Sequence, residues 1–128
     1  MISRTESITQ ILAANPDFST RWQNHLNYWH NSSPGLCIDF REFALFVEQL
    51  FVENAQPSLE KNFQMIESFM VFGDDEVKTA TSTCLLENLL HRVSKTIPAD
   101  KFVRLLGNES RAYCQAWDEY TGVTTEGL

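Results

Sequence analysis

The sequence has no long apolar run, which argues against a membrane-spanning segment. A transmembrane helix needs about 20 consecutive apolar residues, and no such stretch occurs in the 128 residues of the chain. The opening segment, Met1–Glu6, has a single basic residue with no apolar run behind it, so the pattern of a secretory signal peptide is also missing. We therefore expect a protein that begins at Met1, has no membrane association and resides in the cytoplasm.

Cysteine is scarce, and its spacing excludes two common uses. Cys37, Cys84 and Cys114 are odd in number, lie far apart and form no CxxC pair. This pattern argues against a disulfide framework and against a zinc site. We expect three reduced thiols, with Cys84 in the core.

Basic residues are outnumbered, since 10 Lys and Arg face 17 Asp and Glu and give a net charge of -7. An acidic protein repels nucleic-acid phosphates and anionic lipid, so neither is an expected partner. The acidity has two interpretations that the sequence leaves open. It either maintains solubility or complements a basic protein partner.

Strand patterns are almost absent, because the only β-prone piece, Leu36–Ile38, is three residues long. Apolar residues recur instead at steps of three and four, which predicts an all-α fold. Seven helices are expected, over about Ser3–Ala14, Asn15–His30, Asp39–Ala55, Pro57–Gly73, Asp74–Lys95, Pro98–Gly107 and Asn108–Gly122. Residues 123–128 are expected to form a loose tail.

Cap residues support several of these boundaries. Ser3 with Glu6 has the form of a capping box, and Asp39, Asp74 and Asn108 are suitable N-caps. The fifth helix is apolar around most of its circumference and should be the most buried. The core is expected to include Phe43, Phe46, Leu85 and Leu89.

Connections of two to four residues between most of these helices place neighbours roughly antiparallel. We expect a single domain over residues 1–128 that stacks helical hairpins. A compact bundle and a short HEAT-like array both satisfy this pattern.

No catalytic motif is present, because the chain lacks a GxSxG elbow, a P-loop and a GxGxxG turn. His25 and His30 are five residues apart and cannot grip one metal from a helix face, whereas Glu87 and His91 share a face as an ordinary helix pair. The acidic groups do not follow EF-hand spacing. The sequence thus predicts no enzyme, cofactor or metal. A site assembled from His25, His91 and distant carboxylates is the least favoured alternative.

Two sets of residues are candidates for contact with a protein partner. One is acidic and lies around the turn between the fourth and fifth helices, although the first-turn carboxylates also stabilise a helix dipole; it consists of Asp74, Asp75 and Glu76 with Glu60 and Glu67. The other consists of Tyr28, which lies off the apolar stripe of its helix, and Tyr120, which lies near the chain end. Exposed aromatic residues of this kind anchor interfaces.

The segments Gly73–Ala80, Cys84–Leu90 and Leu106–Cys114, followed by Trp117-Asp118, resemble a family of small bacterial helical proteins. Members of that family accompany polymorphic toxins as candidate immunity proteins, and the resemblance covers about the C-terminal two-thirds of the chain. It implies a protein that binds and silences a cognate toxin stoichiometrically. An acidic helical domain would suit a basic, nuclease-like toxin. The alternative is a helical adaptor or regulatory module that binds a cellular protein or peptide.

Overall fold

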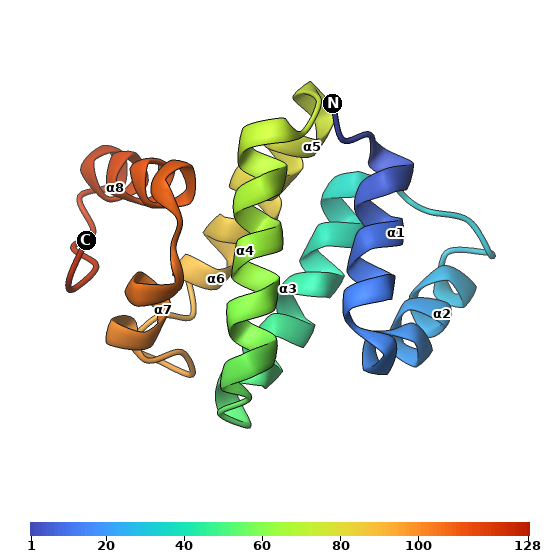
Figure 1. The fold of residues 1–128 in the computed structure, drawn as a ribbon, viewed down its shortest axis with the longest axis horizontal. Helices are drawn as coiled ribbons and strands as arrows, with labels where there is room; N and C mark the ends of the chain where they lie inside the picture. Colours follow the sequence, from blue (N-terminus) through green and yellow to red (C-terminus); the bar gives the residue numbers. More distant parts are fainter.

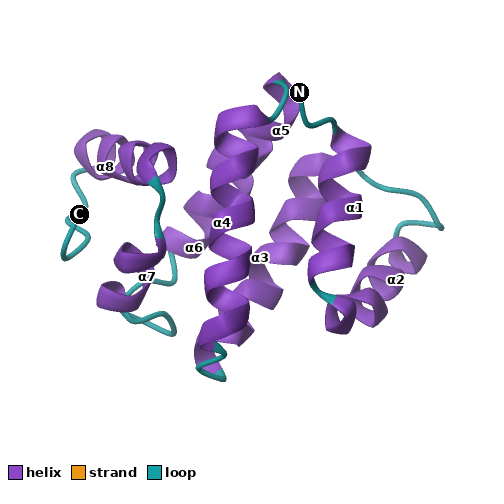
Figure 2. Cartoon of the chain, in the orientation of Figure 1, coloured by secondary structure: helices purple, strands orange, loops and turns teal.

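All regular elements of the computed structural model are helices, and the model describes the whole chain, Met1–Leu128 (Figure 2). The only strand-like contacts are isolated backbone pairings of Ile2 with Gly73 and of Val93 with Ile97. The predicted all-α fold is confirmed. No helix combines the length and the apolar character that crossing a membrane requires.

Seven continuous helical segments make up the fold, as the periodicity predicts. They are α1 (Arg4–Ala14), the 3-10 turn η1 (Pro16–Phe18) with α2 (Ser19–Tyr28), α3 (Leu36–Val52), α4 (Gln56–Phe72), the unbroken run of α5 (Asp75–Thr79), η2 (Ala80–Leu86) and α6 (Glu87–Leu90), α7 (Ala99–Leu105) and α8 (Asn108–Thr121). In Figure 1 the segments from α1 to α6 alternate in direction, whereas α8 lies across the direction of α4. The hairpin arrangement therefore holds for the first five segments, and α8 departs from it.

The start of α1 is closed by the predicted capping box. The Ser3 hydroxyl accepts from the Glu6 amide, and the Glu6 carboxylate accepts from the Ser3 amide, both at 3.2 Å. Ile2 also pairs with the end of α4, because its amide donates to the Phe72 carbonyl at 2.7 Å and its carbonyl accepts from the Asp74 amide at 2.9 Å. The chain start is thus fixed beside the turn between α4 and α5 (Figure 1).

The third helix begins earlier than the sequence predicts. Gly35, with φ of 132°, precedes α3, so the β-prone Leu36–Ile38 forms its first turn and Asp39 lies inside the helix. Asp39 cannot act as the N-cap because its buried carboxylate accepts hydrogen bonds from His25 and Ser33. The prediction of an Asp39 cap is wrong because the carboxylate bonds to residues outside its own helix, which local sequence does not reveal.

The fifth helix differs from an ordinary α-helix at its centre. Asp74 caps it as predicted, accepting from the Val77 amide at 2.9 Å, but η2 is a π-helix and the helix ends at Leu90 instead of Lys95. Within η2, the hydroxyls of Thr81, Ser82 and Thr83 donate to carbonyls four residues earlier, in α5. Such bonds compete with the backbone ladder and accompany its distortion.

One apolar cluster of 25 buried residues extends from Ile11 in α1 to Cys114 in α8. Phe43, Leu85 and Leu89 are fully buried, as expected, whereas Phe46 is only partly buried and packs against the cluster. The prediction that the fifth helix is the most buried agrees with the full burial of Leu85 and Leu89.

A disulfide joins Cys37 to Cys84, with the two Cα atoms 5.3 Å apart. This corrects the prediction of three reduced thiols, since only Cys114 is free, and it is buried. Spacing in the sequence could not show the pair, because the two cysteines are 47 positions apart and tertiary packing of η2 on α3 brings them together. Cys84 itself is buried, as predicted.

The C-terminal residues also differ from the prediction. Gly107, and not Asn108, occupies the cap position of α8, and Gly122 ends the helix in a left-handed conformation at φ 76°. The tail beyond it is not loose at Thr125, which is buried and donates from its amide and hydroxyl to the Asp118 carboxylate at 2.6 and 2.9 Å. Residues 123–128 therefore fold back on α8.

Candidate functional site

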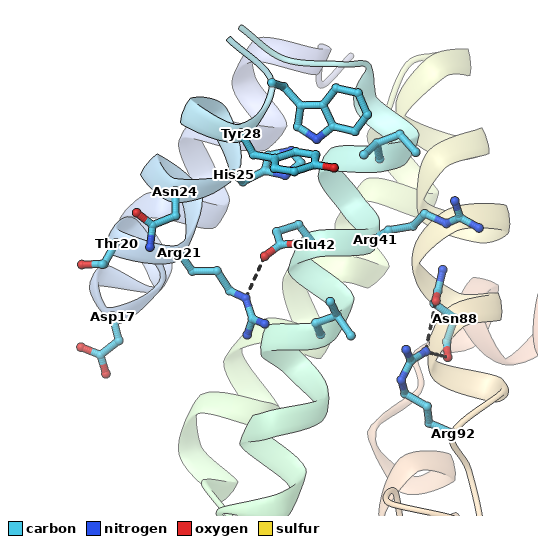
Figure 3. Close-up of a pocket in the computed structure, with 13 residues that line it drawn as sticks. Asp17, Thr20, Arg21, Asn24, His25, Tyr28, Arg41, Glu42, Asn88 and Arg92 are labelled. Carbon is cyan, nitrogen blue, oxygen red and sulfur yellow. Dashed lines mark hydrogen bonds and ion pairs between the residues drawn. The ribbon is translucent and has the colours of Figure 1, made fainter. Parts of the chain in front are cut away.

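The largest hollow on the surface lies between α2, α3 and α6 and has a volume of about 770 Å³ (Figure 3). Three of the six arginines of this acidic chain line it, together with the two aromatic residues at the end of α2. We call this hollow the arginine groove and define it by Arg21, Arg41, Arg92, Tyr28 and Trp29.

The three arginines differ in what they contact. Arg21 pairs with Glu42 at 2.8 Å, and Arg92 pairs with Glu48 at 2.9 Å. Arg92 also donates to the backbone and side-chain oxygens of Asn88 at 2.9 and 3.1 Å. Arg41 is exposed and takes part in no hydrogen bond or ion pair with the chain. The groove therefore offers one guanidinium free for a ligand.

Two aromatic side chains lie at the edge of the arginine groove. Tyr28 is 78% exposed and Trp29 is 39% exposed. Their ring centroids are 5.3 Å apart and the rings meet edge to face, at 81°. α2 ends at Tyr28, two residues earlier than predicted, and His30 and Asn31 then take left-handed φ values of 61° and 63°. This sharp exit of the chain leaves both rings at the surface.

A buried polar network fixes the wall behind these rings. His25 Nε2 donates to Asp39 Oδ1 at 2.8 Å, and the Ser33 hydroxyl donates to Asp39 Oδ2 at 2.5 Å. Arg4 in turn donates to the Ser33 oxygen at 2.7 Å. His25 is therefore engaged by a buried carboxylate. Because the serine donates to the aspartate and not to the histidine, these groups lack the order of a catalytic triad.

The acidic residues of the turn between α4 and α5 have unequal roles. Asp74 caps α5, and Glu76 forms an ion pair with Arg4 at 3.7 Å. The Asp75 side chain is exposed and forms no hydrogen bond or ion pair within the chain. Of these three candidates, only Asp75 carries a carboxylate that is free of intramolecular contacts.

Glu67 is not available as a surface carboxylate, which corrects its assignment to a partner-binding set. Its oxygens accept from the amides of Glu109 and Ser110 at 2.8 and 2.9 Å and from the Ser110 hydroxyl at 2.8 Å. Gly107 is required here because a Cβ at this position would lie 2.4 Å from the Glu67 side chain. Glu67 therefore caps α8 from α4 and holds the two helices together.

Glu60 is exposed but lies at the opposite end of α4 from Asp74. At 1.5 Å per residue, the 12 positions from Glu60 to Phe72, where α4 ends, correspond to about 18 Å of helix. The predicted acidic set therefore does not form one continuous surface.

Tyr120, like Tyr28, is exposed as expected, at 92%. It lines a separate hollow between α6 and α8 together with Glu87 and Trp117. The expected pairing of Glu87 with His91 is not formed, since Glu87 accepts from the Tyr113 hydroxyl and the His91 ring packs edge-on against Trp117 at 5.5 Å.

Two groups near α8 have raised pKa values. Burial raises the pKa of the Cys114 thiol to about 12, with the nearby Asp118 carboxylate acting in the same direction. Burial, followed by the hydrogen bond to Glu87, raises the pKa of the Tyr113 phenol to about 12. Neither group ionises near neutral pH, so Cys114 is a poor nucleophile and Tyr113 stays a hydrogen-bond donor.

No cluster of three or more His, Cys, Asp or Glu side chains is arranged to hold a metal ion. The groove residues that the sequence interpretation did not propose as partner contacts are Trp29 and the three arginines. The Tyr28-Trp29 doublet directly before a turn was the signal available for the aromatic pair. Nothing in the spacing linked Arg41 to it, because α3 approaches α2 only in the folded chain.

The chain belongs to a family described as a domain of unknown function (DUF7674), whose pattern matches residues 8–122. The match covers most of the chain and includes the arginine groove as well as α8. Comparisons with curated proteins and with solved structures find no match.

Proposed function

We propose that this chain is a non-catalytic protein-binding domain, and that it acts as an immunity protein that neutralises a cognate bacterial toxin by stoichiometric binding. The observation that carries the proposal is the arginine groove, where an exposed Tyr28-Trp29 pair lies beside the unpaired Arg41. The identification of the partner as a toxin rests on the family resemblance of the C-terminal segments.

The chemistry of the arginine groove suits contact with a protein. Tyr, Trp and Arg are the residues that most often dominate interface energies. Tyr28 and Trp29 expose apolar area together with a hydroxyl and an indole N–H. Arg41 can donate several hydrogen bonds to carboxylate or carbonyl groups of a partner without first breaking an internal ion pair.

The groove is also organised before binding. Arg21 and Arg92 are held by Glu42 and Glu48, and the wall behind Tyr28 is fixed by the buried contact of His25 with Asp39. A rigid surface loses little conformational entropy on association, which favours affinity.

The net charge of -7 supports a partner with a basic surface, such as a nuclease-like toxin. Long-range attraction of this kind raises the association rate, while the anchors in the groove determine the lifetime of the complex. Asp75 is the carboxylate of the α4–α5 turn that is free to contribute, with Asp74 and Glu76 adding their charge to the same region.

A cytoplasmic location is part of this proposal, because a toxin must be silenced in the cell that makes it. The Cys37–Cys84 disulfide weighs against it, since such bonds persist mainly in oxidising compartments. Alkylation of thiols in rapidly acid-quenched cells, followed by mass measurement, would show whether the pair is oxidised in the source cell. A reduced pair there would support the cytoplasmic location, and a fully oxidised pair would count against it.

The test of function is protection and binding with the product of a neighbouring toxin reading frame. The chain should form a 1:1 complex and restore growth, and the double variant Tyr28→Ala/Arg41→Ala should bind at least about 30-fold more weakly. The matched control is Phe72→Ala/Arg104→Ala, which removes an exposed aromatic residue and an exposed arginine outside the groove. An equal loss of affinity in both double variants would contradict the role of the arginine groove in binding. Tight groove-dependent binding to a non-toxic cellular protein would favour the adaptor.

A further inference from the structure

A second hollow, of about 450 Å³, lies between α6 and α8, on helices other than those that carry the aromatic pair of the arginine groove. Tyr113, Trp117 and Tyr120 line it from α8, where their spacing of four and three places them along one face. Glu87, the first residue of α6, lines the same hollow. Three aromatic rings and one carboxylate thus meet at one place.

The Glu87 carboxylate is positioned by this chain and keeps one oxygen free. The Tyr113 hydroxyl donates to Glu87 Oε2, whereas no side chain or backbone group donates to Oε1. Trp117 is held by the edge-on contact with His91. Tyr120 extends from the end of α8 and is almost fully exposed, so nothing within the chain occupies the space beside it.

The hollow has no internal cation. No Lys or Arg lines it, and the arginines nearest in sequence are engaged elsewhere: Arg92 pairs with Glu48, and Arg111 donates to the Val103 carbonyl. Aromatic faces and a carboxylate both attract an organic cation. A metal ion fits poorly, because the single carboxylate is one ligand where calcium or magnesium requires about six oxygens.

We propose that this hollow binds the side-chain ammonium of a lysine presented by a protein partner. The ammonium would lie against Trp117 and Tyr120 and donate to Glu87 Oε1, while the net charge of -7 favours a partner rich in such groups. The inference rests on the proposed function only for the identity of the molecule that carries the lysine.

The probe is N-acetyl-lysine amide, titrated into the ¹⁵N-labelled full chain and followed by amide chemical shifts. Amides of α8 and of Glu87 should shift in a saturable way, with an affinity on the order of millimolar. N-acetyl-norleucine amide, which lacks the ammonium, should cause no saturable shift there. N-acetyl-arginine amide tests the selectivity, and stronger binding of it than of the lysine compound would overturn the assignment to lysine.

Two variants with matched controls make the test specific. Glu87→Gln retains an acceptor for Tyr113 and should weaken lysine binding about fivefold, whereas Glu119→Gln removes an equal charge from an exposed position outside the hollow and should change it less than about twofold. Tyr120→Ala should weaken binding about two- to fivefold, and Tyr28→Ala should have no effect. Equal effects of Glu87→Gln and Glu119→Gln, or saturable binding of the norleucine compound, would overturn the proposal. Because this titration uses no toxin, its failure is distinct from failure of the complex through the arginine groove.

Discussion

The α2–α3 side and the α8 side of the molecule are held in place by different means. On the first side, Asp39 is 1% exposed and joins His25 to Ser33, and a disulfide ties α3 to η2. On the second, the half-buried Glu67 caps α8 from a neighbouring helix, and the local cysteine is a free thiol. On both sides a carboxylate accepts hydrogen bonds that stabilise the fold. The formal acidity of the chain therefore overstates how much negative charge is free to meet a partner.

Removal of the Asp39 carboxylate should lower the free energy of unfolding more than any other change. Asp39→Ala leaves the buried His25 ring and the Ser33 hydroxyl without their acceptor, at a cost of about 3 to 5 kcal/mol in the free energy of unfolding. Urea unfolding monitored by circular dichroism measures it. Asp17→Ala, an exposed aspartate beside the arginine groove, is the control and should cost below about 0.5 kcal/mol. A similar small cost for Asp39→Ala would mean that the network does not hold this side.

Loss of the disulfide should have the second largest effect on the free energy of unfolding. The bond joins residues 47 positions apart, and its reduction should lower the free energy of unfolding by about 2 to 4 kcal/mol. Thermal unfolding with and without dithiothreitol measures the change, and Cys37→Ser should abolish the difference.

Thiol counting checks the same bond independently. Without reductant, Ellman's reagent should find no reactive thiol in the native protein and one, Cys114, after denaturation. Three thiols after denaturation would show that Cys37 and Cys84 are not joined.

On the α8 side, Glu67→Ala should cost about 2 kcal/mol, because the exposed Glu109 amide and the amide and hydroxyl of the buried Ser110 lose their acceptor. Glu60→Ala, on the same helix, should cost below about 0.5 kcal/mol. Hydrogen exchange should locate the loss of protection in α8. If exchange rises first in α2 or α3, the two sides are not held separately.

The smallest effect on stability should come from removal of the Tyr113 hydroxyl. Its pKa is raised to about 12 by burial and then by the bond to Glu87, so the folded state favours the neutral phenol. The contribution to stability is complete below pH 10, the ordinary pKa, and is lost as the pH rises from 10 to 12. The difference in melting temperature between the parent and Tyr113→Phe should therefore change over that interval. A constant difference across it would contradict the assigned shift.

The sequence was sufficient for the helices whose signals are local. The capping box of Ser3 and Glu6, the Asp74 cap and the Gly122 stop are each decided by a few adjacent residues, and all three are found. The same reasoning failed at Asp39, where a residue with good cap chemistry is used for a buried contact with another helix. It also failed inside the fifth helix, since hydroxyl-rich residues do not by themselves specify a π-helix.

Apolar periodicity by itself determined the all-α class and the number of helical segments, because a helix buries one stripe whatever its neighbours are. Tertiary structure alone decided that Cys37 meets Cys84, that Glu67 caps α8 and that Arg41 lies beside Tyr28 and Trp29. Each of these contacts is between residues on different helices. Their distances depend on how helices pack, and helix packing is set by the shapes of whole faces, which no local spacing encodes.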